Sequence, residues 1–337
     1  MTYSTSAAAL VSGVLLWQVT GLPQLHAYVT RHVKLTPAER TRLLAGQPVT
    51  RLMDAEPSRE VAVFGAIWVD APMSRYVTAV KDIEQFEKGA NFRITKKISD
   101  PPRAEDFSQM DVPDDDVADL RRCRVGSCEL KLSEAALTRI QKGVDWSKPT
   151  AQADVEAIAK RLALDYVTGY VEAGNARLAA YRDSSRPTFV GEEFRSMIER
   201  LPAMTEFLPA MKTYLLEFPK ASLPNAHSFL YWQEAKFGLK PTIRINHLVI
   251  VEQPTDVVVA SKMLYASHYF WTALELRVLV ADPARGKGFW FVSVNRRRSD
   301  GLTGFVGSLI RGKIRGEAEK GMLAVLKTTK TNLERGR

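Results

Sequence analysis

The last hundred residues decide the fold, because strand-like segments there are followed by one long helix. The segments read TIRINHLVIV (242–251), VVVASKMLYASHYFWTALELRVLVA (257–281) and FWFVSVNRRR (289–298), and the helix reads GLTGFVGSLIRGKIRGEAEKGMLAVLKTTKTNL (301–333). An earlier strand at 59–70 and a helix at 73–88 precede them. This order predicts an α+β protein in which a curved antiparallel sheet grips the C-terminal helix and leaves an apolar cavity between the two.

The spacing of apolar residues in the final helix predicts the face that packs on the sheet. The residues at helical spacing are Leu302, Phe305, Leu309, Met322 and Leu326. Because a helix repeats every 3.6 residues, these side chains form one stripe. After its first residue the same helix contains five glycines, each of which costs up to about 1 kcal/mol relative to Ala. We therefore expect packing to hold the helix in place.

The net charge of the protein is concentrated at the C-terminal end. The chain of 337 residues has a formal net charge of +9, and residues 285–337 hold 13 Lys or Arg against 4 Asp or Glu. The basic residues on or beside the final helix include Arg311, Lys313, Arg315 and Lys320. One interpretation is a surface that meets an anionic membrane, and the other is a solvated helix face that keeps the protein in solution.

The N-terminus carries a short apolar run, Ala7 to Val19, followed by Gly21, Pro23 and Ala27. Thirteen residues are too few to span a bilayer of about 30 Å comfortably, but they suit the apolar region of a secretory signal. No Lys or Arg precedes the run, so a short anchor helix or a misassigned start codon remains an alternative. We expect residues 1–27 to be a signal peptide or short anchor, and residues 28–58 to be a helical extension.

The two cysteines agree with export. Cys123 and Cys128 enclose a short loop with Gly126 available for a turn, which favours an intrachain disulfide in an oxidising compartment. In the cytosol the same residues would be two free thiols. We expect one main domain at 59–337 with a helical insertion at 133–224, because helical patterns fill that stretch between the predicted strands.

Several classes of protein are excluded by missing motifs. The sequence contains no GxSxG elbow, Walker loop, GxGxxG after a strand, or HExxH, and no recognisable nucleic-acid module. A run of acidic residues at 114–116 lacks the alternating spacing of a calcium loop. We therefore expect no metal, no cofactor and no nucleic-acid partner.

Polar residues on the predicted strands are the candidates for a ligand site. They are His268, Lys262, Tyr231, His247, Tyr269 and Arg296. On a strand that faces a cavity, His268 would bind a ligand head group or donate a proton. The alternative is that His268 is a structural residue whose ring binds neighbouring groups of the sheet.

The order of elements resembles the START-like superfamily, which includes polyketide cyclases and lipid-transfer proteins with the helix-grip fold. The matching features are Val69-Asp70-Ala71-Pro72 between a strand and a helix, the strands that follow, and a closing helix entered through 298–302. Segments 123–128, 231–241 and 260–270 are also similar to an uncharacterised group of bacterial proteins with apparent export signals. The resemblance implies a hydrophobic ligand pocket, and it transfers no catalytic residue.

Three functions follow from these patterns. The first is binding or transfer of a lipid or other hydrophobic small molecule by a monomeric, non-catalytic protein of the cell envelope, exported to the periplasm or membrane-associated. The second is a cyclase or hydrolase that uses His268 with Tyr269 or Lys262 in the same cavity. The third is a structural envelope protein without a ligand.

Overall fold

The computed structural model describes residues 21–56, 58–89, 91–236, 240–300 and 304–336, and for 304–311 it describes the backbone alone. The apolar run at 7–19 therefore lies outside the described residues. Three members of the predicted helix stripe, Leu302, Phe305 and Leu309, also lie outside the described side chains.

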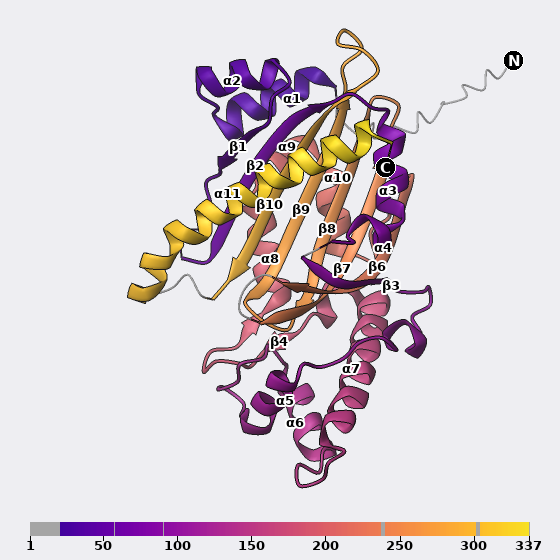
Figure 1. Ribbon diagram of the computed structural model, residues 1–337, viewed down its shortest axis with the longest axis vertical. Coiled ribbons are helices and arrows are strands. Elements are labelled where there is room, and N and C mark those ends of the chain that lie inside the picture. Colours follow the sequence, from indigo (N-terminus) through magenta and orange to yellow (C-terminus); the bar gives the residue numbers. More distant parts are fainter. Residues whose placement is uncertain (1–20, 57, 90, 237–239, 301–303, 337) are drawn as a thin grey trace, which may run out of the picture.

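A sheet of eight antiparallel strands forms the centre of the molecule, in the order β1-β2-β10-β9-β8-β7-β6-β3 (Figure 1). The strands are β1 (Val49–Leu52), β2 (Glu60–Val69), β3 (Phe92–Lys97), β6 (Ala226–Lys236), β7 (Pro241–Glu252), β8 (Asp256–Ala266), β9 (Phe270–Ala281) and β10 (Phe289–Ser299). The predicted α+β class with a large antiparallel sheet and a C-terminal helix is confirmed. The predicted segment 257–281 is two strands, because the chain turns back at 267–269, where Tyr269 adopts a left-handed backbone with φ 62°.

Helices cover both faces of the sheet, which explains why the strands between its two edges are buried at most positions. One face carries α3 (Met73–Lys81), α4 (Ile83–Phe86) and α11 (Gly304–Glu334). We call this the α11 face. The opposite face carries α8 (Val190–Glu199), α9 (Pro202–Phe207) and α10 (Pro209–Glu217). Since alternate residues of a strand point to opposite faces, each strand contributes to two separate cores.

The C-terminal helix α11 lies diagonally across the sheet, and its last turns approach α3 (Figure 1). Met322 and Leu326, two residues of the predicted stripe, are buried on this face. Gly65 of β2 permits the contact, because a Cβ atom at that position would lie 2.6 Å from Cγ of Met322. Residues 312–315 are exposed on all sides, so the start of α11 extends past the edge of the sheet.

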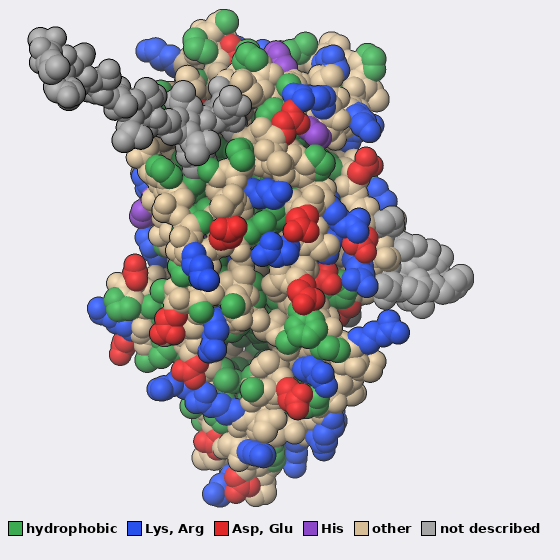
Figure 2. All heavy atoms as spheres, turned by 180° about the vertical axis from the view of Figure 1, so that it is seen from behind, with side chains coloured by type: hydrophobic (Ala, Val, Ile, Leu, Met, Phe, Trp, Pro, Cys, Tyr) green, Lys and Arg blue, Asp and Glu red, His purple; other side chains and the backbone are tan. Residues whose placement is uncertain are grey.

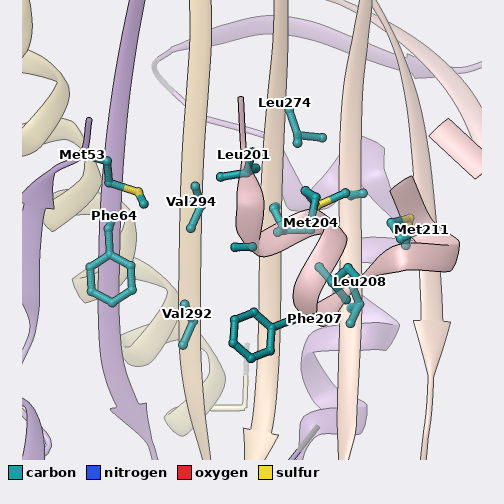
Figure 3. Close-up of a cluster of buried hydrophobic side chains, with 14 of the residues drawn as sticks. Met53, Phe64, Leu201, Met204, Phe207, Leu208, Met211, Leu274, Val292 and Val294 are labelled. Atoms are coloured by element: carbon teal, nitrogen blue, oxygen red, sulfur yellow. The ribbon is translucent and has the colours of Figure 1, made fainter. Parts of the chain in front are cut away.

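The opposite face holds the largest hydrophobic core. Figure 3 shows α9 lying against the strands, with its apolar side chains directed at those of β9 and β10. The labelled residues of this cluster include Met204, Phe207, Leu208, Leu274, Val292 and Val294. Pro202 and Pro209 start α9 and α10, and each provides the fixed backbone angle that suits a first helical turn.

The insertion is longer than predicted and is not wholly helical. The chain leaves the sheet after β3 and returns at β6, so residues 98–225 are inserted rather than 133–224. The further elements of the insertion are a 3₁₀ turn η2 (Ala104–Phe107), α5 (Asp114–Arg122), α6 (Glu134–Gly143), α7 (Ala151–Ala173), a second 3₁₀ turn η3 (Gly174–Arg177), and the strand pair β4 (Ala180–Tyr181) and β5 (Thr188–Phe189). Cys123 and Cys128 are joined by a disulfide as predicted.

The N-terminal extension also differs from the prediction. Residues 28–58 contain the π-helical turn η1 (Val29–Val33) and α2 (Pro37–Leu44), which begins with a capping box of Thr36 and Glu39. They also contain β1, which pairs with β2 at the edge of the sheet. Within the predicted signal segment 1–27, α1 (Leu22–Tyr28) packs Leu25 against the core of the opposite face. Residues 22–27 are therefore part of the folded protein.

Candidate functional site

An apolar pocket of about 450 Å³ lies between the inserted helices and one end of the sheet. Its walls come from α5, α6, α7 and η3, and from the ends of β7 and β8 on the face opposite α11. Side chains that line it include Leu120, Ala136, Ile140, Leu162, Tyr166 and Ile245. Its volume falls in the range of about 300–1,000 Å³ that is usual for small-molecule sites. The element order predicts a cavity between the sheet and α11, and for this pocket that location is wrong.

Small residues at facing positions of two helices create the pocket. Ala135 and Ala136 of α6 line it, as do Ala159 and Ala163 of α7. Larger side chains next to them pack into a separate core, in which Leu120, Ile140 and Val155 are buried. The three helices are thus held by this core, while the alanines leave space beside it.

The hydroxyl of Tyr166, a polar group in the pocket wall, already has partners. The Tyr166 hydroxyl donates to the carbonyl oxygen of Leu264 at 2.7 Å and accepts from the backbone N–H of Ala179 at 3.3 Å. Burial raises the pKa of Tyr166 well above its ordinary value, so this hydroxyl stays protonated at neutral pH. Its role is to fix α7 against β8.

Three charged residues line the pocket, Arg139, Asp165 and Arg177, and Arg161 pairs with Asp165 from outside the lining. We call these four residues the rim cluster. Asp165 accepts from Arg139 at 2.9 Å through one carboxylate oxygen and from Arg161 at 3.2 Å through the other. Nε of Arg177 lies against α7, only 2.9 Å from the place of a Cβ atom at Gly169. The cluster therefore combines three guanidinium groups with one carboxylate.

His268, the leading sequence candidate, is placed beside this pocket but is hydrogen-bonded on both sides. Its Nε2 lies 2.9 Å from an Asp116 carboxylate oxygen, and its Nδ1 lies 3.2 Å from the carbonyl oxygen of Glu129. Both ring nitrogens thus face acceptors, which an imidazolium ring satisfies with its two N–H groups. The His268 and Asp116 side chains are each 4% exposed. This arrangement fits a structural histidine that ties α5 to the turn between β8 and β9.

Tyr269 follows His268 in the chain but contacts a different part of the protein. Its hydroxyl accepts a hydrogen bond of 2.8 Å from the backbone N–H of Lys240. The Lys240 side chain, in turn, pairs with Asp116 and Asp119 of α5. Tyr269 therefore supports the strand end at residue 240.

Lys262 and His247 are cross-strand neighbours on the face opposite α11. Nζ of Lys262 donates to Asn175 Oδ1, to the carbonyl oxygen of Leu215 at 3.1 Å and to the Tyr170 hydroxyl at 3.4 Å. Tyr170 also contacts Nδ1 of His247 at 3.0 Å. Burial lowers the pKa of Lys262 well below its ordinary value, and burial together with the charge of Lys262 lowers the pKa of His247 to about 3. These residues form a closed network between the sheet and the inserted helices.

Arg296 lies in the same cross-strand row, opposite Leu274, but takes part in a buried ion cluster. Its guanidinium binds Glu60, which also pairs with Arg298 at 3.3 Å. Arg298 in turn reaches Glu193 of α8 at 2.7 Å. The cluster joins β2, β10 and α8. The guanidinium groups of Arg296 and Arg298 are therefore engaged by carboxylates of the protein itself.

Tyr231 lies on the α11 face, on the other side of the sheet from Lys262 and His247. Its hydroxyl is 3.2 Å from Ser261 Oγ, in a small polar pocket that also includes Glu87 and Glu275. Arg277 lies between those carboxylates, 2.9 Å from Glu275 and 3.9 Å from Glu87. Burial raises the pKa of Glu87; burial acts the same way on Glu275, but the neighbouring arginines outweigh it and lower that pKa. The six sequence candidates therefore do not converge on one site.

The predicted membrane-facing residues are exposed where their side chains are described. Lys313, Arg315 and Lys320 are exposed on α11, and Lys320 pairs with Glu317 at 2.9 Å. Lys313, Lys320 and Lys327 recur every seven residues, so they lie along one side of the helix. The side chain of Arg311 lies outside the description.

The residues that line the apolar pocket are absent from the sequence candidates. Many of them come from α6 and α7, which the sequence identifies only as part of a helical insertion, and others come from α5, which precedes the predicted insertion. The available signal was the group of alanines on two helices that otherwise carry large apolar side chains. Alanine is also the best helix former, so that signal alone does not distinguish a pocket from ordinary helix composition.

In a comparison with known proteins, no family model, no curated protein and no solved structure matches this chain. Within the described residues, no helix is both long and apolar enough to cross a membrane. The same residues contain no group of three or more His, Cys, Asp or Glu arranged to hold a metal ion.

Proposed function

We propose that this protein binds a hydrophobic small molecule or lipid in the pocket beneath the inserted helices, without catalysis. The observation that carries the proposal is the largely apolar pocket of about 450 Å³, in which the hydroxyl of Tyr166 is already hydrogen-bonded. A pocket of that kind offers apolar contact area and no reactive group. Transfer of the bound molecule between envelope surfaces is the process that such binding would serve.

The helix-grip interpretation belongs to this proposal. In its support, β2 and β6–β10 share one antiparallel sheet, and α11 packs across the sheet beside β2. In the START-like proteins that the sequence resembles, such an arrangement accompanies binding of apolar ligands. Here we propose that the insertion at 98–225 supplies the ligand site instead of the space beneath α11.

The enzymatic alternative loses the residues on which it rested. His268 is engaged by Asp116 and Glu129, and Lys262 by three acceptors on α7, η3 and α10. Tyr269 points its hydroxyl to a backbone N–H. A general acid or base must reach the reacting atom, and none of these three side chains lines the apolar pocket.

We also propose export and contact with an anionic membrane surface. The disulfide between Cys123 and Cys128 supports an oxidising compartment. The exposed lysines of α11 support the membrane contact, because basic side chains are attracted to anionic lipid headgroups.

Filling the pocket tests the central proposal. Ala136 lines the pocket, so Ala136→Trp should remove binding of an apolar ligand, whereas Ala157→Trp on the exposed side of α7 should not. Native mass spectrometry of protein purified gently from its host provides the measurement. Wild-type protein that carries no co-purifying lipid and takes up none on incubation would contradict the proposal.

A further inference from the structure

We infer that the ligand of the apolar pocket is an amphiphile with a single anionic head, and that Arg177 binds the head at the rim. This inference rests on the proposed function, because it names the chemical class of the molecule that the same pocket takes. Its basis is the charge of the rim cluster together with the largely apolar lining of the interior.

The rim cluster has more positive than negative charge. Asp165 is the carboxylate of the cluster, and its two oxygens are taken by Arg139 and Arg161. Among the residues that the structure describes, no carboxylate forms an ion pair with Arg177, which is exposed and lines the pocket. Three guanidinium groups beside one carboxylate leave a positive rim, and Arg177 is the member whose fork is available to an oxyanion.

The position of Arg177 suits a head group at the mouth of the pocket. Its Nε approaches α7 at Gly169, one helical turn beyond Asp165. That approach requires residue 169 to lack a side chain, because a Cβ atom there would lie 2.9 Å from Nε. The guanidinium is thereby held at the edge of the pocket, next to the apolar wall formed by Leu162 and Tyr166.

The interior offers few partners for a second polar group, the hydroxyl of Tyr265 being the main one. Asp116, which reaches the wall, is already bound by His268 and Lys240. Tyr166 is bound to the backbone at both ends of its hydroxyl. Burying a polar group without a hydrogen bond is costly, so the part of the ligand inside the pocket is mostly hydrocarbon, with room for a polar group only beside Tyr265. An alkyl chain with one acidic end fits both the apolar interior and the rim cluster.

Matched ligands test the head group. We expect the full-length protein to bind decanoate and decyl phosphate at least ~10-fold more tightly than decanol, measured by titration calorimetry, since a charge-assisted hydrogen bond adds that much affinity. The excess affinity should fall as salt increases, because the rim is exposed. The comparison of decanoate with decyl phosphate distinguishes a carboxylate head from a phosphate head, and tight binding of either supports the inference.

Variants at the rim test whether Arg177 binds the head group. Arg177→Gln should weaken decanoate binding ~10-fold and leave decanol binding unchanged, while Arg177→Lys should retain part of the preference. Asp165→Asn should strengthen decanoate binding, because it frees Arg139 and Arg161. The control is Arg186→Gln, an equal change of charge at an exposed residue of the insertion outside the pocket.

The outcomes separate this inference from the proposed function. Equal affinity for decanoate and decanol, both abolished by Ala136→Trp, would overturn the anionic head group and keep the apolar site. Unchanged decanoate binding in Arg177→Gln would overturn the role of Arg177. Failure of all three ligands to bind, or binding that Ala136→Trp does not affect, would overturn the proposed function itself.

Discussion

Two buried histidines show how position on the sheet determines the role of a residue. His268 sits in a turn, where Asp116 and Glu129 of the insertion reach both of its ring nitrogens. His247 sits in the middle of β7, where Tyr170 is its hydrogen-bonding partner and the rings of Phe218 and Tyr214 surround it. The first residue is held among polar groups, and the second is buried as a neutral ring.

His268→Ala is expected to destabilise the protein without affecting ligand binding. The change leaves the buried Asp116 carboxylate with Lys240 alone, so the free energy of unfolding should fall by about 1–3 kcal/mol. Chemical unfolding and ligand titration on the same protein provide the two measurements. His227→Ala, at an exposed position of β6, is the matched control. A variant with unchanged stability and lost binding would make His268 a ligand residue after all.

The pKa of His247 predicts a loss of stability in acid. The folded-state pKa is about 3, whereas an unfolded histidine titrates near about 6.5. Between these values the unfolded chain binds a proton that the folded protein excludes, so stability falls as pH drops from about 6.5 towards about 3.

Urea unfolding of wild type and His247→Gln over this range provides the test. The stability of the variant relative to wild type should rise as pH falls, because the glutamine does not titrate. Above about pH 7 the difference should be constant, since His247 is then neutral in both states. A difference that stays constant throughout the acid range would show that His247 becomes charged in the folded protein.

At the scale of elements, the disulfide loop holds one end of the insertion together. Cys123 ends α5, and the backbone N–H groups of Gly126 and Cys128 donate to the carbonyl oxygens of Arg182 and Asp183 at 2.7 and 3.0 Å. α5 also lines the apolar pocket through Leu120. The bond thus fixes a helix of the pocket wall to the strand pair of the insertion.

Removing the disulfide should lower stability by about 2 kcal/mol, the loop-entropy contribution of so short a loop. Thermal unfolding with and without reductant measures this in wild type. The control is the double variant Cys123→Ala with Cys128→Ala, which has no disulfide. Reductant should therefore not change its thermal stability. For the native protein, unreduced peptide mass spectrometry should find the Cys123–Cys128 bond, and two free thiols would count against both the bond and export.

At the scale of the whole molecule, α11 carries part of the excess positive charge, with six Lys or Arg against three Asp or Glu between 304 and 334. Figure 2 shows the side away from α11, where Lys and Arg are interspersed with Asp and Glu. On α11, Lys313, Lys320 and Lys327 form an exposed row on one side of the helix. A membrane contact through this row would leave the pocket free on the other face of the sheet.

The lysine row predicts binding to anionic vesicles. Each basic residue near an anionic leaflet contributes on the order of 1 kcal/mol within a Debye length, so co-sedimentation should rise with anionic lipid and fall with salt. Charge reversal of Lys313, Lys320 and Lys327 to Glu should abolish it. The control reverses Arg40, Lys142 and Arg186, which are three exposed residues away from α11.

Duplex DNA must be present as a competitor, because it is drawn to the same charge. Vesicle binding that is indifferent to lipid charge, or that persists unchanged in molar salt, would leave the row as a solvated helix face.

The sequence by itself determined β2, β7 and β10 but not β1 or the division of 257–281 into two strands. β-Branched and aromatic residues specify strands locally, and capping residues such as Thr36 and Glu39 specify helix starts. It also determined the disulfide, because the two cysteines are five residues apart. Tertiary structure alone decided which face of the sheet holds the pocket. That depends on residues far apart in the chain, such as Ala136, Leu162 and Ile245, and on α11 filling the space at Gly65. Local periodicity shows which side of an element is apolar, but the volume left between elements is fixed only by how they pack.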